Sequence, residues 1–333
     1  MRAAFREAGL SSEVFADQVH QRLQGEARPA AELGARVGPG DVVLYHLSIG
    51  APTARLFAEL GCRRGIVYHN ITPSAYYRAT SPRVAGWLDQ GRRDLARLAP
   101  AVEIGVADSA YNAGELGEAG CPAIMVIPPP VDLGRLDPRP ARATGAPRLI
   151  FVSRLAPNKR QEDLVRILAA LRAGGQASAT LVLPGGWDDT EPYAAGLRRL
   201  ARELGVGEAV ELPGRCSDRR IGDLYAGASV AVCASAHEGF GMHLLEAWAF
   251  DLPVVARAAA AVPETVGDAG VLLRSDDPLV WAGVVDRVIR DGEFRRALVE
   301  RGRRRLLDFS DAAFTRRIRD LLERLGLRPP SAG

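Results

Sequence analysis

The chain has 333 residues, more than one hydrophobic core usually serves, so its length predicts two domains. Hydrophobic residues make up 47% and charged residues 25%, a composition typical of globular proteins. A formal net charge of +3 without a dense basic block excludes the charge signature of a nucleic-acid-binding protein. We expect a cytoplasmic protein, because no apolar run approaches the roughly 20 residues of a membrane helix and the N-terminus lacks a signal-peptide pattern.

The cysteines and the single lysine are informative. Cys62, Cys121, Cys216 and Cys233 have no metal-binding or redox spacing, so we expect free thiols in a reducing compartment. Lys159 is the only lysine among 43 basic residues, a bias that indicates a GC-rich, bacterial coding sequence. A lysine kept against that bias indicates a role that arginine performs poorly. We expect no metal site, since the sequence has no Asp-x-Asp motif and no zinc-ligand spacing.

In the first half, short apolar runs alternate with helical patterns, as in a parallel α/β sheet. The expected strands are residues 11–16, 41–46, 65–70, 102–107 and 123–127. Helical patterns cover residues 52–60 and 82–98, and Ser109 is placed to cap a helix that runs to Ala119.

The second half repeats this alternation beyond a segment rich in proline, glycine and arginine. We predict an N-terminal domain at residues 1–130, a linker at 131–147 and a second domain at 148–308. The expected strands of the second domain are residues 148–153, 179–184, 209–214, 228–234, 253–256 and 270–273. Residues 277–307 are predicted to be helical with a break near Gly292. Residues 309–333 are predicted to carry a last helix that packs back on the first domain. Both domains are expected to be doubly wound, with ligands beyond the carboxyl ends of the strands.

Residues 234–256 combine a strand end, a turn with two glycines, a helix and another strand. Gly239 and Gly241 allow backbone N–H groups close to an anion, at the positive end of the helix that follows. Glu238 lies in the turn and Glu246 about two helical turns later, roughly 10 Å away at about 1.5 Å per residue. The two carboxylates suit different parts of one extended ligand, and a carboxylate accepts both hydroxyls of a ribose. The alternative is a pair of solvated charges around an ordinary turn.

A second strand end places Arg154 and Lys159 around a short loop before a helix. Cations are unfavourable at a helix N-terminus because the helix dipole repels them. A bound diphosphate would remove this penalty, with arginine as a planar fork and lysine as a point charge. The alternative is again a pair of solvated side chains.

On these motifs, residues 148–307 resemble glycosyltransferase family 4 (glycosyl transferases group 1), which has the GT-B fold. The family pattern is Gly-Arg-Leu-x-x-x-Lys, then Glu-Gly-Phe-Gly-x-x-x-x-Glu-Ala-x-Ala-x-Gly-x-Pro-Val-Val-Ala. The resemblance implies two Rossmann-like domains with parallel sheets that face each other across a cleft. It implies a retaining, metal-independent transferase that moves a hexose from a nucleotide diphosphate sugar, such as a UDP- or GDP-linked one. The acceptor would be a glycan, lipid or small molecule, and no cofactor is expected.

The resemblance also implies roles for single residues. Arg154 and Lys159 would hold the diphosphate, Glu238 would face the donor sugar and Glu246 would bind the ribose. The further donor-binding positions are Ser153, Leu212, Gly214, Gly239, Phe240, Gly241 and Met242. Ser153 replaces the family's glycine before the arginine, and Asp251 replaces the glycine between helix and strand, where aspartate tolerates a left-handed backbone.

Histidines follow two strands of the first half. His69 ends the run at 65–70 and His46 the run before it. A strand-end histidine is more often structural, but the resemblance implies that His69 contacts the donor sugar or the acceptor, and His46 would line the same cleft. His20, His237 and His243 are weaker candidates. Three arginines on the helix at 82–98 suggest weak peripheral membrane contact, with a solvated helix face as the alternative; they are Arg92, Arg93 and Arg97.

The family's first strand and glycine-rich loop are not found before residues 1–10, which already have a helical pattern. Residues 11–16 would then be the second strand, and the sheet would lack its central strand. A start displaced downstream explains this pattern. The alternative function is an inactive nucleotide-sugar-binding protein or an N-terminally truncated fragment.

Overall fold

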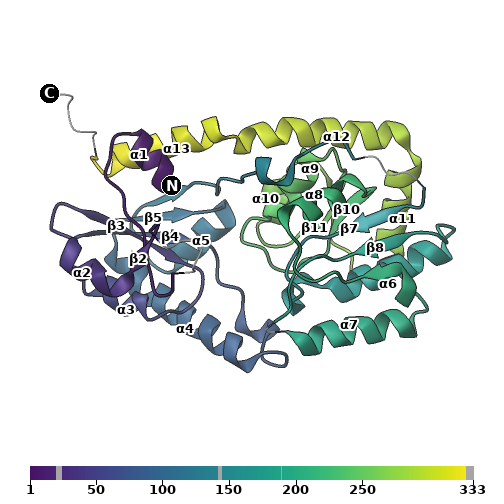
Figure 1. Cartoon of the computed structure of the whole chain (residues 1–333), viewed down its shortest axis with the longest axis horizontal. Helices are drawn as coiled ribbons and strands as arrows, with labels where there is room; N and C mark the ends of the chain where they lie inside the picture. The colour runs from purple at the N-terminus through teal and green to yellow at the C-terminus, as the bar shows by residue number, and fades with distance from the viewer. Residues whose placement is uncertain (20–24, 142–144, 189, 328–333) are drawn as a thin grey trace. The chain divides into compact units, whose positions relative to one another are not determined.

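The computed structural model describes residues 1–19, 25–141, 145–188 and 190–327. The chain divides into two compact units, each built on a parallel sheet (Figure 1). The first unit comprises Met1–Pro73, Gly86–Pro130 and Ser310–Gly333 as far as described, and the second comprises Ser74–Ala85 and Val131–Phe309.

The sheet of the first unit has four parallel strands in the order β3-β4-β5-β6. They are β3 (Val42–Leu47), β4 (Arg63–Tyr68), β5 (Ile104–Ala107) and β6 (Ile124–Val126). All four overlap expected strands, with their ends shifted by one or two residues. The last four residues of β4 and all of β5 are buried, as expected for parallel strands covered on both faces.

Helices flank this sheet (Figure 1). They are α1 (Arg2–Glu7), α2 (Leu33–Arg36), α3 (Thr53–Ala58), α4 (Pro82–Leu98), α5 (Ala110–Glu118) and α13 (Asp311–Arg324). The hydroxyl of Ser109 accepts from Asn112 N and caps α5, as predicted. The C-terminal helix α13 buries Phe314 and Ile318 in one cluster with Ile104 of the sheet.

The expected strand at residues 11–16 is largely absent. Only Phe15–Ala16 is extended, as β1, and it pairs with β2 (Arg28–Pro29) in a separate two-stranded sheet. Its residues are only half-buried, and the polar stretch before them offers no apolar face to pack. Within the described residues β1 and β2 are not joined to the four-stranded sheet, and β3 is an edge strand of that sheet.

The second unit has six parallel strands in the order β12-β11-β10-β7-β8-β9. They are β7 (Arg148–Ile150), β8 (Thr180–Val182), β9 (Val210–Glu211), β10 (Val230–Cys233), β11 (Val254–Arg257) and β12 (Val271–Leu273). Counted within the unit this is the order 3-2-1-4-5-6 of doubly wound dinucleotide-binding sheets. The strand order reverses between β7 and β10, and ligands of such sheets bind at that switch point.

Seven helices of the described second unit surround its sheet. They are α6 (Gln161–Ala173), α7 (Glu191–Glu203), α8 (Asp218–Ala226), α9 (Met242–Ala249), α10 (Val262–Val266), α11 (Pro278–Arg290) and α12 (Gly292–Leu306). The predicted break near Gly292 is present, because the side chain of Asp291 caps α12 by accepting from Phe294 N. Trp248 and Trp281 are fully buried in the core.

The segment predicted to be a linker is in part packed into the second unit. Residues 134–136 form a 3-10 turn, η5, and Leu136 is fully buried. The turn lies so close to α8 that a Cβ on Gly222 would be 2.1 Å from the carbonyl oxygen of Leu136. Ala141 N donates to Phe250 O at 2.8 Å, and residues 142–144 lie outside the described residues. Burial of Leu136 fixes a segment whose composition alone indicated no structure.

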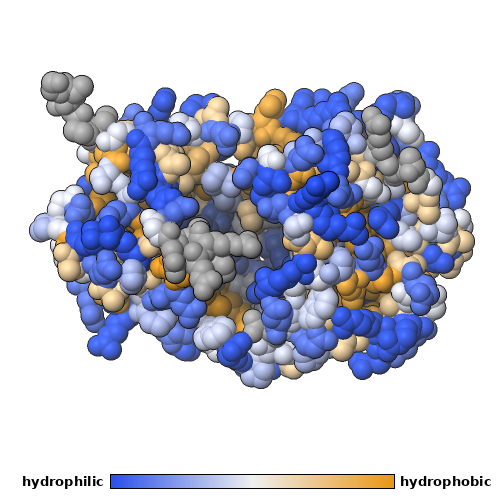
Figure 2. Space-filling model, in the orientation of Figure 1, coloured by the Kyte–Doolittle hydropathy of each residue, from blue (hydrophilic) through white to orange (hydrophobic). Residues whose placement is uncertain are grey.

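The expected basic face of α4 is mostly paired. Arg92 donates to Glu115 at 3.0 Å and to the carbonyl of Ile71, and Arg97 pairs with Asp94 at 3.2 Å. No described helix is long and apolar enough to cross a membrane. Hydrophilic residues cover much of the visible surface of each unit, and hydrophobic ones are scattered among them (Figure 2).

Candidate functional site

The loops that follow β7 and β10 meet at the switch point of the second sheet. They comprise residues 151–159 and 234–241. Asn158 joins them twice, because its side-chain amide donates to His237 O at 3.2 Å and its carbonyl accepts from Ala236 N at 2.9 Å. These bonds hold the two sequence motifs together at the edge of the sheet where a ligand is expected.

Lys159 and Glu238, one from each loop, form a buried ion pair. The ammonium lies 2.7 Å from both carboxylate oxygens, and Ser235 donates to one of them at 2.7 Å. Burial raises the pKa of Glu238, but the attraction of Lys159 and the hydrogen bonds outweigh it, and the pKa is lowered. Glu238 is therefore ionised at neutral pH. The structure thus pairs two residues that the sequence analysis assigned to separate parts of the ligand.

Arg154 is exposed, and its guanidinium contacts a tyrosine side chain. Its guanidinium donates to the hydroxyl of Tyr77 at 3.0 Å and lies 5.9 Å from the ring centroid. The same hydroxyl donates to Asn158 Oδ1 at 3.1 Å, and Tyr77 is fully buried. Tyr77 lies in residues 74–85, which come from the first half of the chain but cluster with the second unit. The sequence carried no signal for this contact.

The turn between β10 and α9 has the geometry of an anion site. Gly241 is the N-cap of α9 with φ +98°, so the helix begins without a capping side chain. The side chain of Phe240 is buried and its carbonyl accepts from Thr265 at 2.6 Å, whereas Met242 is 51% exposed. Only the backbone of Phe240 can therefore face a ligand. Gly239 lies in the same turn, next to Glu238.

The carboxylate of Glu246 is buried under an arginine. Tyr225 donates to Oε2 at 3.0 Å, and Arg135 pairs with Oε1 and also with Asp218. Burial raises the pKa of Glu246, and the bonds from Tyr225 and Arg135 only partly offset that rise. Arg135 belongs to η5, in the predicted linker, which is why the sequence analysis missed it.

The loops after β7, β8 and β9 lie side by side. A Cβ on Gly185 would be 1.9 Å from Ser153 O, and Gly185 N donates to Gly214 O at 2.9 Å. Gly214 has φ +75° and faces the ring of Trp187, which sequence reasoning missed. Leu212 is half-buried against the core. Ser153 and Gly214, predicted donor-binding positions, thus flank one short stretch of the sheet edge.

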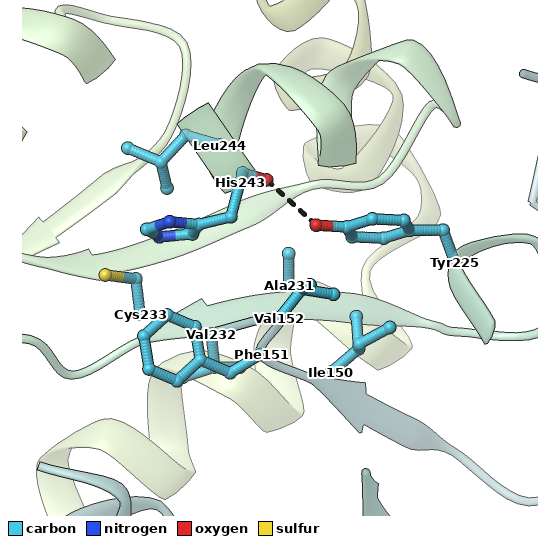
Figure 3. A pocket seen from close by; sticks show the side chains of 9 residues that line it. All are labelled: Ile150, Phe151, Val152, Tyr225, Ala231, Val232, Cys233, His243 and Leu244. Carbon is cyan, nitrogen blue, oxygen red and sulfur yellow. Dashed lines mark hydrogen bonds between the residues drawn. The ribbon is translucent and has the colours of Figure 1, made fainter. Parts of the chain in front are cut away.

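A small cavity lies behind the glycine turn, between β7, β10 and α9 (Figure 3). The imidazole of His243 points toward Cys233 and packs edge-on against Phe151, with ring centroids 5.0 Å apart. The hydroxyl of Tyr225 lies 3.3 Å from the carbonyl of His243. Among the described residues the Nε2 atom of His243 is buried without a hydrogen-bond partner, and burial lowers the pKa of this imidazole to about 4.

Three potential metal ligands lie close together at this cavity, and two of them, Cys233 and His243, line it. Single atoms of Cys233, Glu238 and His243 lie within 4.8 Å of one another. Burial raises the pKa of the Cys233 thiol to about 12, so the thiol is protonated at neutral pH. Lys159 already neutralises Glu238.

The predicted histidines of the first unit lie together at the carboxyl end of its sheet. His46 Nδ1 is 2.8 Å from His69 Nε2, and His69 Nδ1 is 2.9 Å from Asp108 Oδ2. Sequence reasoning missed Asp108, although it directly follows an expected strand. Of the weaker candidates, His237 is buried beside Asn158, and His20 lies outside the described residues.

The fold and this edge of the second sheet define a class. A doubly wound sheet with a glycine turn, ionised side chains and buried carboxylates at its switch point is a nucleotide-binding domain. The chain belongs to the family described as glycosyl transferases group 1, whose model matches residues 135–305.

Two named relatives are similar to this chain over most of its length. A D-inositol 3-phosphate glycosyltransferase of Salinispora arenicola is 34% identical over 250 residues, which are 66% of this chain and 54% of the relative. A GDP-mannose-dependent alpha-(1-6)-phosphatidylinositol monomannoside mannosyltransferase of Mycolicibacterium smegmatis is 30% identical over 313 residues, 85% of this chain and 76% of the relative. The match to the inositol phosphate relative thus spans about half of that protein's length.

Solved structures confirm the fold. HepE of Anabaena, in complex with UDP and glucose, has a TM-score of 0.72 at 19% identity, covering 97% of this chain and 88% of that one. Sucrose-phosphate synthase of Thermosynechococcus elongatus has a TM-score of 0.69 at 20% identity, covering 86% and 73%. The GT-B fold expected from the sequence is therefore correct.

Proposed function

We propose that the chain is a retaining, metal-independent hexosyltransferase that uses a nucleotide diphosphate sugar, with a UDP- or GDP-linked hexose as donor. The observation that carries this proposal is the position of the Lys159–Glu238 pair and of Glu246 on either side of one glycine turn at the switch point. A family match over this segment and named glycosyltransferases among the relatives support it.

Each part of the site has a task in this proposal. Glu246 accepts the ribose hydroxyls, and the N-terminus of α9 binds phosphate oxygens. Arg154 and Lys159 stabilise the negative charge that develops on the leaving diphosphate, which is the task a metal ion performs in other transferases. Glu238 faces the donor sugar and holds Lys159 in place.

The acceptor class follows from the relatives' names. One is named for inositol 3-phosphate and another for phosphatidylinositol monomannoside, so we propose a hydroxylated acceptor such as an inositol phosphate or its lipid-linked form. We place the reaction in the cytoplasm because all four cysteines are free thiols, as is typical of a reducing compartment. We propose that the reaction needs no cofactor besides the nucleotide sugar.

Binding of nucleotide diphosphates tests the donor half. UDP, GDP and ADP are compared by calorimetry and thermal shift with excess EDTA, since a ligand at 100 times its Kd stabilises by roughly 2.7 kcal/mol. We expect one of them to bind, and Glu246→Ala to weaken that binding. Glu203→Ala, which alters an exposed glutamate of α7, is the matched control. Failure of all three nucleotides to bind would overturn the proposal.

Measurements of turnover test the catalytic part of the proposal. Donor hydrolysis and transfer to inositol phosphates are followed with EDTA present, and the anomeric configuration of the product is read by NMR. We expect Glu238→Ala to reduce turnover more than nucleotide binding. Binding without hydrolysis or transfer would instead favour a nucleotide-sugar-binding protein, and an inverted product would contradict retention.

A further inference from the structure

Three polar residues stand on adjacent strands at the carboxyl end of the first sheet. His46 lies near the end of β3, His69 directly follows β4 and Asp108 directly follows β5. His69 N donates to Leu47 O at 3.0 Å, which continues the β3–β4 pairing and fixes the backbone of His69. The register of the sheet therefore places the three side chains in a row at the edge where ligands of parallel sheets bind.

The row runs from the interior to solvent. The side chain of Asp108 is 9% exposed and that of His69 is 32% exposed, whereas His46 is exposed. Asp108 Oδ2 and Oδ1 lie 2.9 and 3.2 Å from His69 Nδ1, and His69 Nε2 lies 2.8 Å from His46 Nδ1. Both ring nitrogens of His69 are thus occupied, so the outer end of the row is His46 Nε2.

The positions of the protons follow from this geometry. A carboxylate only accepts hydrogen bonds, so the proton of a neutral His69 is on Nδ1. The unprotonated Nε2 of His69 then accepts from His46 Nδ1–H. A neutral His46 carries only that one proton, and its Nε2 is left as a lone pair that faces outward.

We propose that His46 Nε2 is a hydrogen-bond acceptor for a hydroxyl group of the sugar or polyol substrate, and that Asp108 and His69 are positioning residues that set its tautomer. This rests on the proposed function, because both substrates of such a transferase carry hydroxyl groups. The hydroxyl belongs either to the donor sugar or to the acceptor, and the kinetic test below distinguishes the two.

His46 orients the hydroxyl rather than removing its proton. Desolvation by the surrounding chain, the adjacent His69 and the amino group of Met1 together lower the pKa of His46 to about 4, although the residue is partly open to solvent. An imidazole with so low a pKa is too weak a base to remove the proton of a hydroxyl group efficiently, but its Nε2 can still accept a hydrogen bond from that group. The groups that face it are His69, with Asp108 behind, and the N-terminus at α1.

Nitrogen NMR of the whole ¹⁵N-labelled chain tests the tautomers without any substrate. Long-range ¹H–¹⁵N spectra at neutral pH, assigned with His46→Gln and His69→Gln, are expected to show Nδ1–H on both rings. Asp108→Ala should shift His69 toward Nε2–H and His46 toward Nε2–H as well, an exchange that a merely structural carboxylate would not cause. A proton on His46 Nε2 in the parent protein, or a doubly protonated His69, would overturn the proposal.

Enzyme kinetics tests whether His46 binds a substrate hydroxyl group. His46→Ala is expected to lower kcat/KM about tenfold, the effect of one lost hydrogen bond, while His46→Gln keeps an acceptor oxygen and regains part of the rate. A rise confined to the acceptor KM identifies the acceptor hydroxyl, and slower donor hydrolysis identifies the donor sugar. Unchanged kinetics in folded His46→Ala would refute the ligand role.

The proposed transferase function and the proposed role of His46 can be tested independently of each other. Binding of UDP or GDP to the parent protein decides the donor function, and the NMR result decides the histidine row whether or not a nucleotide binds. His46→Ala should leave the Kd of the nucleotide diphosphate unchanged, because Glu246 and the glycine turn belong to the second unit.

Discussion

Arg135 makes an ion pair with the buried carboxylate of Glu246, 111 residues further along the chain. The arginine sits on the η5 turn before the first strand of the second unit, and the glutamate sits on α9. Because Glu246 is buried, its ionisation depends on the few donors that reach it, and Arg135 is the charged one. A segment without a recognisable motif therefore controls the charge of the candidate ribose ligand.

Replacing Arg135 should make nucleotide binding more sensitive to acid. Burial already raises the pKa of Glu246, and loss of the guanidinium raises it further, so the carboxyl is protonated over a wider pH range. We expect Arg135→Ala to weaken nucleotide diphosphate binding about tenfold at neutral pH and more as the pH falls. Calorimetry across the pH range measures this.

Arg139→Ala is the matched control for that experiment. Arg139 lies four residues away on the same segment and pairs with Asp137 and Asp223, away from Glu246. Equal affinities for the parent protein, Arg135→Ala and Arg139→Ala at every pH would rule out the role given to Arg135.

Gly222 should be required for the same contact. A Cβ there would lie 2.1 Å from the backbone oxygen of Leu136, so Gly222→Ala must displace η5 and with it Arg135. We expect a loss of about 2 kcal/mol in unfolding free energy, typical of overpacking, together with weaker nucleotide binding. Gly283→Ala in α11 has no atom within 4 Å of the new Cβ and should be neutral or stabilising by up to about 1 kcal/mol. Similar urea midpoints for the two variants would contradict the prediction.

The parts of the site within short motifs were predictable from sequence, and the long-range parts were not. Gly241 and Glu246 lie on one turn and the helix after it, so their spacing alone fixes their relation. Tyr77 reaches Arg154 across 77 residues, and Asp108 reaches His69 across 39. Such contacts depend on which strands become neighbours, and the local residue pattern does not encode that order.

The strand predictions show the same division between features set by the local sequence and features that depend on long-range packing. Central strands such as β5 and β10 are apolar and buried along their length, and both lie within predicted strands. Residues 11–16 and the η5 turn were misjudged for opposite reasons. The first was predicted to be a strand, but its polar beginning packs against no core, whereas the second has a linker composition but a buried leucine.

Stability should fall in acid because of His243. Burial lowers the pKa of His243 in the folded protein to about 4, below the ordinary histidine value of 6.5, so the unfolded chain binds the additional proton between these two pH values. The stabilisation is therefore fully present above pH 6.5 and is lost as the pH falls toward 4. Between pH 7.5 and pH 5 the expected loss is about 2 kcal/mol from this group.

His243→Leu isolates that contribution. The variant removes a buried nitrogen that lacks a partner and keeps an apolar contact with Phe151, so it should fold without a large penalty. Urea unfolding at the two pH values should show a smaller acid loss than in the parent protein. Glu238, whose pKa is lowered, loses its contribution only at more acid pH, outside this interval. An unchanged difference between the two pH values would count against His243.

Asp251 offers a test of how the chain replaces a glycine of the family pattern. Its backbone is left-handed, with φ +57°, and its carboxylate takes two bonds from Arg303, at 2.6 and 2.7 Å. Strain of about 1 kcal/mol is expected for a non-glycine residue here. The exposed ion pair with Arg303 offsets part of this strain.

Three variants separate these effects. Asp251→Gly removes strain and ion pair together and should change the free energy of unfolding by less than about 1 kcal/mol. Asp251→Ala keeps the strain and loses the pair, so it should be the least stable of the three. Arg303→Ala loses only the pair and, because that side chain is exposed, should destabilise the protein less than Asp251→Ala does. If Asp251→Ala matched Asp251→Gly in urea unfolding, the left-handed backbone would carry no measurable cost, and the aspartate would be kept for Arg303 alone.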